Sequence, residues 1–363
     1  MPAQKIDSLT SLRFFAAGMV VVFHTRREFG YFGLAEHLAL TQAVSLFFVL
    51  SGYILAHTHR TITSRSDLYV FYIKRLARIW PLHLVGAAAA AWLIHYEGGS
   101  VGSTAAILNV LLLHAWSPDI DTYFSLNGVS WSLSDEAFFY VVFPLLIWRV
   151  NATWVVKLAG TILVTAAMLV VFENMGRPLM LWSAYISPIT RLSEFMMGIA
   201  AYQLRATLRN AIEGGWRASA FEIGAVLIVM SAIWATDLRV VSDLPFHLSK
   251  PAAIWLSNCG VGVLFALLIA VFALEDGGLS RLLRARPLIY LGEISFALYV
   301  VHQLVLRFAE DHGYMAQSYP VAVKAALYWL AAIAVAVAVH HLIEIPVQRL
   351  ILSRLAVRRG VVV

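Results

Sequence analysis

Residues 8–24 read SLTSLRFFAAGMVVVFH, an apolar run that is long enough to cross a bilayer as a helix. Two ionisable side chains, Arg13 and His24, lie within this run, although a charge at that depth is costly. The run has no small-residue cleavage site of the kind that follows a secretory signal peptide. It therefore predicts a membrane-crossing helix whose two ionisable side chains are candidates for function.

The composition extends this prediction to the whole chain. Hydrophobic residues make up 60% of the 363 residues and charged residues only 13%, and the mean hydropathy is +0.76. A soluble protein of this size has too little interior to bury so much apolar surface. The sequence predicts an all-α integral membrane protein in which residues 1–363 form a single membrane domain, with no appended soluble domain.

About ten membrane-crossing helices are predicted from the apolar runs. One further apolar stretch, 104–116, is too short to cross comfortably and is interpreted as re-entrant or interfacial. The predicted crossings are 9–26, 40–57, 79–96, 130–148, 154–173, 188–204, 219–236, 252–274, 288–306 and 321–343.

The distribution of cationic side chains orients these helices. If the N-terminus is cytoplasmic, eighteen of the 27 Lys and Arg residues fall on the inner side and six on the outer side, as the positive-inside rule requires. An eleventh crossing at 104–116 would place most of the later cations outside. We therefore expect both termini in the cytoplasm. The net charge of +6 then belongs to the inner loops, and no basic and aromatic patch outside the apolar runs indicates nucleic-acid binding.

The spacing of Arg13 and His24 places them on one face of the first helix. Eleven residues make about three helical turns, and the two side chains are ~16.5 Å apart along the axis. In one interpretation both face a polar track, with His24 beyond the midplane of the membrane. In the other, His24 is a helix-end residue that reaches toward water beside Arg26 and Arg27. Imidazole suits proton transfer because its ordinary pKa of about 6.5 lies near physiological pH.

A pair of arginines precedes the predicted crossing at 79–96. Arg75 and Arg78 are one helical turn apart, so their guanidinium groups share a face. Such a pair suits bidentate binding of a phosphate at the membrane surface. The alternative is ordinary anchoring of the helix by inner cations.

Two later runs carry polar side chains at helical spacing. Ser132, Glu136 and Tyr140 follow one another at intervals of four residues at the start of 130–148. Glu136 is a candidate to orient a histidine or to accept a hydrogen bond from a substrate hydroxyl, and the alternative is a carboxylate paired with a cation for packing. The second polar face lies on 288–306 and comprises Ser295, Tyr299 and His302.

The remaining ionisable and sulfur-containing side chains inside the apolar runs give weaker signals. Arg191 and Glu194 are one turn apart and form either part of a polar track or a purely structural pair. The single cysteine, Cys259, allows no intrachain disulfide. His340 and His341 are adjacent and point to different faces of a helix, and neither HExxH nor CxxC occurs, so no metal is expected.

Taken together, these stretches resemble acyltransferase family 3, a family of integral-membrane proteins that O-acylate glycans and small hydroxylated compounds. The resemblance extends over nearly the whole chain and rests on the number, order and spacing of its motifs. The first motif is the pair of an Arg and a His in 8–24. The others are LFFVLSGYIL (46–55), RLARIWPLHL (75–84), WSLSDEAFFYVVFPLL (131–146), RLSEFMMGI (191–199), LGEISFALYVVH (291–302) and EIPVQRL (344–350).

The resemblance implies ten core spans and a reaction in which an acyl group, most often acetyl, moves from a cytoplasmic acyl-CoA to a hydroxyl. By the same match, His24 is expected to be the catalytic histidine, as a general base or a transient acyl acceptor, with Arg13 as its companion. Arg75 and Arg78 are expected to hold the phosphates of the donor. Glu136 matches the acidic residue of the family's Trp-Ser-Leu-x-x-Glu motif.

One position departs from the family pattern. Many members have a second acidic residue directly after the motif Glu, where this chain has Ala137. Asp135 precedes Glu136 instead, and on a helix it points about 100° away. The resemblance therefore carries no role over to Asp135.

The sequence thus predicts a membrane-bound O-acetyltransferase of the bacterial inner membrane that uses acetyl-CoA as co-substrate. The expected acceptor is a cell-surface polysaccharide or lipid-linked glycan, and a small molecule such as a macrolide sugar is the alternative. A transporter or flippase is the alternative from another class, disfavoured because no repeat symmetry is visible. The expected partners are acyl-CoA, a hydroxylated acceptor and the lipid bilayer.

His24 is expected to carry the chemistry, and substitution of His302 is expected to have a milder effect. The residues of the supporting polar track are expected to be Ser132, Tyr140, Arg191, Ser295, Tyr299 and His302.

Overall fold

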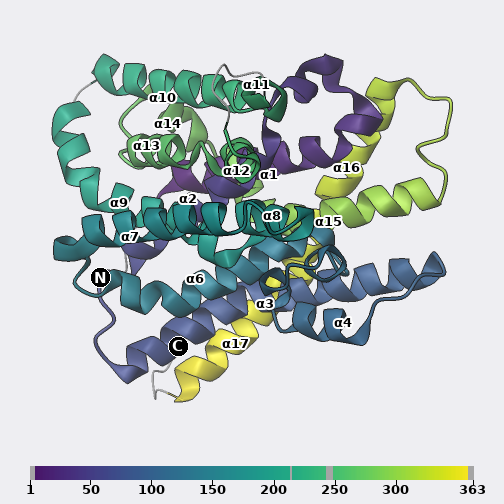
Figure 1. Ribbon diagram of the computed structural model, residues 1–363, viewed down its shortest axis with the longest axis horizontal. Coiled ribbons are helices and arrows are strands. Elements are labelled where there is room, and N and C mark those ends of the chain that lie inside the picture. The colour runs from purple at the N-terminus through teal and green to yellow at the C-terminus, as the bar shows by residue number, and fades with distance from the viewer. Residues whose placement is uncertain (1–4, 213–214, 243–247, 359–363) are drawn as a thin grey trace. The chain divides into compact units, whose positions relative to one another are not determined.

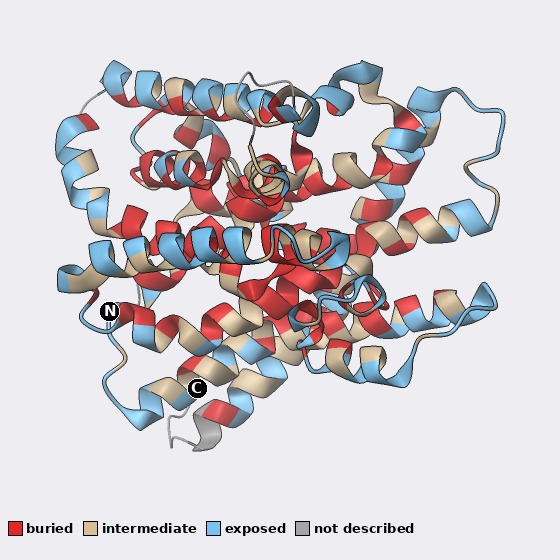
Figure 2. Cartoon of the chain, viewed as in Figure 1, coloured by how far each residue is buried: buried red, intermediate tan, exposed pale blue. Residues whose placement is uncertain are grey.

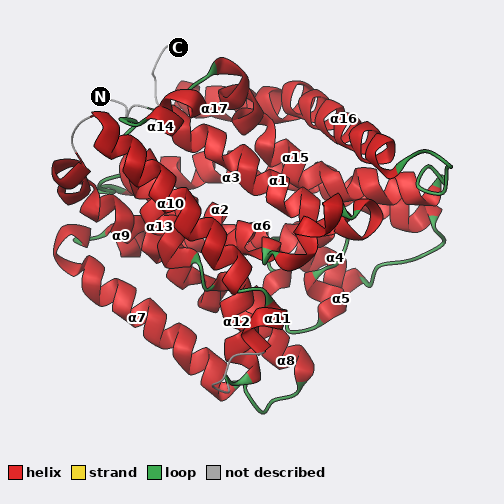
Figure 3. Ribbon diagram, turned by 90° about the horizontal axis from the view of Figure 1, so that it is seen from above, coloured by secondary structure: helices red, strands yellow, loops and turns green. Residues whose placement is uncertain are grey.

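The computed structural model describes residues 5–212, 215–242 and 248–358. Over these residues the chain consists of helices joined by turns and loops, without any β-strand (Figure 3). The predicted all-α fold is confirmed.

The helices group into two compact units, and each unit is assembled from three separate stretches of chain. Unit 1 consists of Met1–Phe23, Gly30–Thr61 and Leu145–Glu293, and unit 2 consists of His24–Phe29, Ile62–Pro144 and Ile294–Val363. The candidate residues are thereby divided between the two units. Arg13 and Arg191 belong to unit 1, and all the other candidates belong to unit 2.

Unit 1 takes most of its helices from the middle of the chain (Figure 1). Its first helix, α1, continues into unit 2. The elements are α1 (Asp7–Phe29), η1 (Tyr31–His37), η2 (Leu40–Gln42), α2 (Ala43–Thr58), α7 (Val150–Val171), α8 (Arg177–Leu181), η5 (Trp182–Ile186), α9 (Pro188–Ile212), α10 (Gly215–Ala235), α11 (Leu238–Ser242), α12 (Lys250–Cys259), α13 (Gly262–Phe272) and α14 (Gly278–Leu283).

Unit 2 combines helices from the first half and the end of the chain. Within it, α3 and the C-terminal helix α17 run side by side (Figure 1). Helix α6 ends in unit 1 and helix α15 begins there. The elements are α3 (Arg65–Tyr96), α4 (Ser103–Val110), η3 (His114–Trp116), α5 (Ile120–Tyr123), η4 (Gly128–Ser130), α6 (Trp131–Ile147), α15 (Arg286–Asp311), α16 (Val321–Val339), η6 (His340–Glu344) and α17 (Ile345–Arg358).

Several helices are long and apolar enough to cross a membrane. Eight segments of the described chain meet this requirement: Asp7–Phe29, Leu40–Thr58, Arg65–Tyr96, Val150–Val171, Gly215–Ala235, Lys250–Phe272, Arg286–Asp311 and Val321–Leu355. Helix α7 shows the expected surface, because only 11% of its most apolar part is buried and exposed residues recur along its length (Figure 2). An apolar helix with that exposure suits contact with lipid. The protein is therefore a multi-pass membrane protein.

Two of the ten predicted crossings lie outside this group of eight. The crossing at 130–148 corresponds to α6, which has only 17 residues. The crossing at 188–204 corresponds to α9, in which the first 18 residues include Arg191, Glu194 and Arg205. Both segments are helical as expected, and the total of ten crossings with cytoplasmic termini stays a prediction.

The stretch 104–116 does not form a crossing helix. Helix α4 has only eight residues, which is about 12 Å of helix and far less than the thickness of a bilayer. Side chains of α3 and α6 bind the backbone where α4 ends. Trp80 Nε1 donates to the Val110 carbonyl oxygen at 2.9 Å, and Ser134 Oγ donates to the Leu112 carbonyl oxygen at 2.7 Å.

Two glycines allow α2 and α9 to pack closely in unit 1. A Cβ atom added to Gly52 would lie 2.0 Å from the Phe195 carbonyl oxygen, and one added to Gly198 would lie 1.9 Å from the Val49 carbonyl oxygen. Small residues permit this approach in membrane proteins, where helix association depends on van der Waals contact. Gly52 and Gly198 belong to two of the motifs that carry the family resemblance.

The predicted crossing at 252–274 was expected to be continuous, but it is interrupted. Helix α12 ends at Cys259 and α13 begins at Gly262. The amide of Gln42 binds both sides of the break: its nitrogen donates to the Leu256 carbonyl oxygen at 2.8 Å, and its oxygen accepts from the Val261 N–H at 3.2 Å. In a membrane such groups need protein partners because no water is present to replace them.

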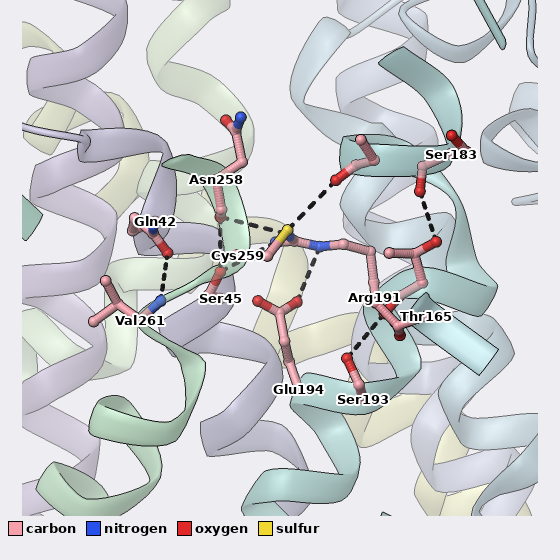
Figure 4. A network of polar contacts seen from close by, with 12 residues as sticks. Gln42, Ser45, Thr165, Ser183, Arg191, Ser193, Glu194, Asn258, Cys259 and Val261 are labelled. Atoms are coloured by element: carbon pink, nitrogen blue, oxygen red, sulfur yellow. Dashed lines mark hydrogen bonds and ion pairs between the residues drawn. The ribbon is translucent and has the colours of Figure 1, made fainter. Parts of the chain in front are cut away.

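A buried ion pair lies on α9, and its arginine contacts residues at this break (Figure 4). Arg191 Nε lies 3.0 Å from Glu194 Oε2, and both side chains are inaccessible to solvent. Arg191 also donates to the Asn258 carbonyl oxygen at 3.4 Å and contacts the Cys259 sulfur. Ser45 Oγ donates to the same carbonyl oxygen at 3.0 Å. The contacts of Arg191 thus favour the structural interpretation of the Arg191–Glu194 pair over the polar track.

The substitution Arg191→Met should destabilise the protein by about 3–5 kcal/mol, because it leaves the Glu194 carboxylate buried without its cation. Thermal unfolding in detergent should show a clear fall in the midpoint, and adding Glu194→Leu to this variant should restore most of it. The control is Arg239→Met, which removes an exposed pair with Asp237 and should cost no more than about 1 kcal/mol. Equal losses in the two single variants would contradict a structural role for the buried pair.

The topology of 104–116 can be tested with single cysteines at Ser100 and Ser117 in a Cys259→Ala background. Because α4 is too short to cross, both cysteines should react with a membrane-impermeant reagent added from outside. Intact cells and inverted vesicles provide the two accessible faces. A cysteine at position 117 that reacts only from the cytoplasmic side would refute the ten-span topology.

Candidate active site

Two histidines from distant parts of the chain meet in unit 2. His24 Nδ1, on α1, lies 3.0 Å from His302 Nε2, on α15, and the centroids of the rings are 5.1 Å apart. His302 is completely buried and His24 is half-buried. His24, from the first predicted crossing, is therefore in direct contact with His302, from the crossing predicted at 288–306.

The ring of His302 is fixed by its own helix. His302 Nδ1 lies 2.8 Å from the Tyr299 carbonyl oxygen and 3.2 Å from the Leu298 carbonyl oxygen. The backbone of His302 is held in turn, because the Tyr328 hydroxyl donates to its carbonyl oxygen at 3.0 Å. The Tyr328 ring packs 5.4 Å from that of Phe29, at the end of the helix that carries His24.

The two predicted polar faces pack against each other next to this histidine pair. The Tyr299 hydroxyl on α15 lies 2.7 Å from Ser132 Oγ on α6 and donates to the Val129 carbonyl oxygen at 2.9 Å. Ser295, one turn before Tyr299, is completely buried. The face that the sequence predicted on α15 therefore points into unit 2.

The predicted arginine pair lies beside the same two helices. The Tyr140 hydroxyl donates a hydrogen bond to the Glu136 carboxylate, and the guanidinium carbon of Arg75 lies 5.9 Å from the centroid of the Tyr140 ring. The guanidinium carbon of Arg78 lies 5.9 Å from the centroid of the Phe296 ring on α15. Both arginines therefore contact aromatic side chains of unit 2 through cation–π geometry.

These contacts set the order of the groups along α15. Arg78 lies beside Phe296, Ser132 binds Tyr299, and His24 binds His302. From position 296 to 302 a helix rises about 9 Å. A short polar face thus joins the arginine pair at one end to the histidine pair at the other.

A second buried polar cluster, which was not predicted from the sequence, lies directly before α6. His83 Nε2 donates to the Asn109 carbonyl oxygen at 2.8 Å, and Asn109 Nδ2 donates to the Ser125 carbonyl oxygen at 2.8 Å. His114 Nε2 lies 3.2 Å from Ser130 Oγ, directly before the start of α6. The only sequence signal was the presence of polar side chains in apolar surroundings, because the cluster joins segments with no common periodicity.

The histidines of this cluster are stacked in parallel, with ring centroids 6.0 Å apart. Burial, with a smaller contribution from the neighbouring His83, lowers the pKa of His114 to about 3. The His114 ring is therefore neutral at physiological pH, and the short helices before α6 are held without a buried charge.

The remaining candidates lie elsewhere or contribute differently. Arg13 is eleven residues before His24 on the same helix, but in unit 1. Arg191 belongs to the network at the α12–α13 break. Asp135 is completely buried. Over the described residues, no three His, Cys, Asp or Glu side chains are grouped in a way that could hold a metal ion.

Comparison with known proteins gives the chain its family. A family model described as an acyltransferase domain matches residues 6–343. Acyltransferase MdmB of Streptomyces mycarofaciens is 32% identical over 385 aligned residues, which cover 96% of this chain and 92% of that protein. No solved structure matches the chain.

Two other relatives are named as O-acetyltransferases. The putative peptidoglycan O-acetyltransferase YrhL of Bacillus subtilis is 24% identical and O-acetyltransferase OatA of Staphylococcus aureus is 23% identical. These alignments cover 83% and 95% of this chain but only 48% and 57% of those proteins, so the chain spans about half the length of these two relatives. The family model covers nearly the whole chain and the relatives are named for acyl transfer, so the predicted enzyme class is confirmed over a transporter. The chain belongs to acyltransferase family 3 and is a membrane O-acyltransferase.

Proposed function

We propose that the protein transfers an acyl group, in the first instance acetyl, from cytoplasmic acyl-CoA to a hydroxyl of a cell-surface polysaccharide or lipid-linked glycan in the bacterial inner membrane. The observation that carries this proposal is the contact between half-buried His24 and fully buried His302. A histidine pair at this position supplies a base within the membrane domain. It lies at one end of a polar face whose other end carries two arginines.

The arginine pair provides the site for the donor. The phosphate groups of acyl-CoA are the anionic part of the molecule, and guanidinium groups bind phosphate oxygens in a bidentate manner. Arg75 and Arg78 precede the part of α3 that is predicted to cross the membrane, so they face the cytoplasmic supply of donor. Arg78 lies beside Phe296 and His24 beside His302, and these two positions of α15 are ~9 Å apart along the helix. The flexible arm of the donor can span this distance and bring the thioester toward His24.

His24 supplies the acid–base chemistry. As a general base it accepts the proton of the acceptor hydroxyl while the oxygen forms a bond to the acyl carbon and the carbon–sulfur bond breaks. The thiolate of coenzyme A then takes a proton from the His24 imidazolium, and the ring returns to its starting state. If His24 instead carries the acyl group transiently, its nitrogen first bonds to the acyl carbon as the carbon–sulfur bond breaks. The acceptor oxygen then bonds to that carbon as the carbon–nitrogen bond breaks, and the hydroxyl proton passes to the thiolate.

The class of acceptor is proposed from two of the relatives. YrhL and OatA are named as O-acetyltransferases, and the name of YrhL includes peptidoglycan. MdmB, which matches this chain over nearly the full length of both proteins, is named only as an acyltransferase. A small-molecule acceptor such as a macrolide sugar is therefore the second candidate. The O-acetyl content of cell-surface glycans in a deletion strain distinguishes the two.

Substitution of Arg75 or Arg78 by Ala should weaken donor binding by about tenfold to a hundredfold, because each charge-assisted contact contributes about 1.5–3 kcal/mol. Lys at either position should restore binding only in part, since an ammonium group cannot form the bidentate contact. Equilibrium binding of acetyl-CoA to the purified protein provides the measurement. The control is Lys74→Ala, which removes an exposed neighbouring cation. If all three Ala variants bind acetyl-CoA as wild type does, Arg75 and Arg78 only anchor the helix.

His24→Gln should lower acyl transfer by a factor on the order of 10²–10⁴, because glutamine is polar but cannot accept a proton. Thiol release from acetyl-CoA in the presence of acceptor provides the rate, and thermal unfolding verifies that the variant is folded. His57→Gln, at a half-buried histidine of α2 in unit 1, is the matched control and should retain the wild-type rate. Folded His24→Gln protein with more than a tenth of the wild-type rate would refute the proposed chemistry.

A further inference from the structure

We propose that His302 is a positioning residue that fixes the tautomer of His24, so that Nε2 of His24 is the atom that accepts the proton of the acceptor hydroxyl. This inference rests on the proposed function and deepens it by assigning the base to a single nitrogen. It also changes the expectation from the sequence that substitution of His302 would have a milder effect.

The backbone of α15 determines which nitrogen of His302 carries a hydrogen. The Tyr299 carbonyl oxygen, 2.8 Å from His302 Nδ1, can only accept a hydrogen bond. The Leu298 carbonyl oxygen, at 3.2 Å, has the same property. His302 Nδ1 must therefore carry a hydrogen. A neutral imidazole has one hydrogen on its two nitrogens, so Nε2 of His302 is an acceptor.

The tautomer of His24 follows from that assignment. His24 Nδ1 lies 3.0 Å from His302 Nε2, and two acceptors at that distance would form no hydrogen bond. His24 Nδ1 therefore carries the hydrogen and donates it to His302. In neutral His24 the lone pair that can accept a proton is then on Nε2.

The opposite arrangement requires a charge in a buried position. If His24 accepted a hydrogen bond from His302, both nitrogens of His302 would carry hydrogens and its ring would be cationic. His302 has no exposed surface, and the groups at its Nδ1 are backbone carbonyls rather than carboxylates. Burial of such an imidazolium is costly, so the neutral arrangement is favoured.

This arrangement assists the reaction at the step where charge develops. When His24 Nε2 takes the hydroxyl proton, the ring becomes an imidazolium whose Nδ1–H is already directed at the lone pair of His302. The position of that lone pair is set by carbonyl groups three and four residues earlier on the same helix, so little reorganisation is needed. His302 touches neither the donor nor the acceptor hydroxyl in this scheme.

The first experiment reads the tautomer directly in the full-length protein. Solid-state ¹⁵N spectra of histidine-labelled protein in lipid, at about two pH units above the ordinary imidazole pKa of 6.5, distinguish a hydrogen on Nδ1 from one on Nε2. The difference between wild-type and His24→Gln spectra assigns the His24 signals. A hydrogen on Nδ1 of His24 is expected, and a hydrogen on Nε2 would overturn the inference. This result holds whether or not the protein transfers acyl groups, so it separates failure of the inference from failure of the proposed function.

The second experiment uses kinetics. His302→Leu, which has no acceptor, should lower kcat by about 100-fold or more while the KM for the donor stays within about threefold. His302→Gln, whose side-chain oxygen can accept from His24 Nδ1–H, should recover to within about tenfold of wild type. The matched control, His340→Gln at a buried histidine bound to Glu344, should retain the wild-type kcat.

Each kinetic outcome decides between a positioning and a packing role. Equal loss in His302→Leu and His302→Gln, or a KM effect without loss of kcat, would assign His302 to packing alone. If His302→Leu fails to fold, the comparison of His302→Gln with wild type and the ¹⁵N spectrum remain as the tests.

Discussion

In a bilayer, each backbone N–H or C=O group that is not bonded within a helix needs a hydrogen-bond partner from the protein. Several buried polar side chains of this chain serve as such partners. Side chains of Gln42, Ser45 and Arg191 bind carbonyl oxygens at the break between α12 and α13. Side chains of Trp80 and Ser134 bind carbonyl oxygens at the end of α4. Many of the buried polar residues therefore bind backbone groups.

At the histidine pair, the backbone carbonyls that bind the His302 ring are already bonded within a helix. The carbonyl oxygens of Leu298 and Tyr299 each have a second lone pair that accepts a hydrogen bond from the His302 imidazole. The ring is thus oriented by regular structure rather than by a strained loop. His24 binds this oriented ring, so its own orientation needs no additional charged residue, which would be costly at that depth.

The sequence predicted the helices and their polar faces well because both depend on local periodicity. The i, i+4, i+7 spacing of Ser295, Tyr299 and His302 identified a face that the structure turns inward, and Ser132 meets it from α6. The interruption at Gly260 was missed, although Ser257, Asn258, Gly260 and Gly262 lie there within the apolar run. At Gly260, a Cβ would lie 2.5 Å from Leu256 Cδ1, a close contact that only the folded helix reveals.

The pairing of His24 with His302 could not be predicted for a related reason. Periodicity tells which residues share a face of a helix, but which faces meet depends on packing among segments far apart in the chain. The buried cluster around His83 and His114 has the same origin, because it joins α3, the end of α4 and the residues before α6. The roles of Arg75, Arg78 and Glu136 come from the family resemblance and stay predictions.

The separation of His24 and His302 by 278 residues also has a consequence for biosynthesis. His24 leaves the ribosome among the first residues, whereas its partner follows only when most of the chain has been made. At about 5–20 residues per second, the interval is on the order of tens of seconds. During that time the first helix is in the membrane without its imidazole partner, so under the proposed function a nascent chain lacks an oriented base.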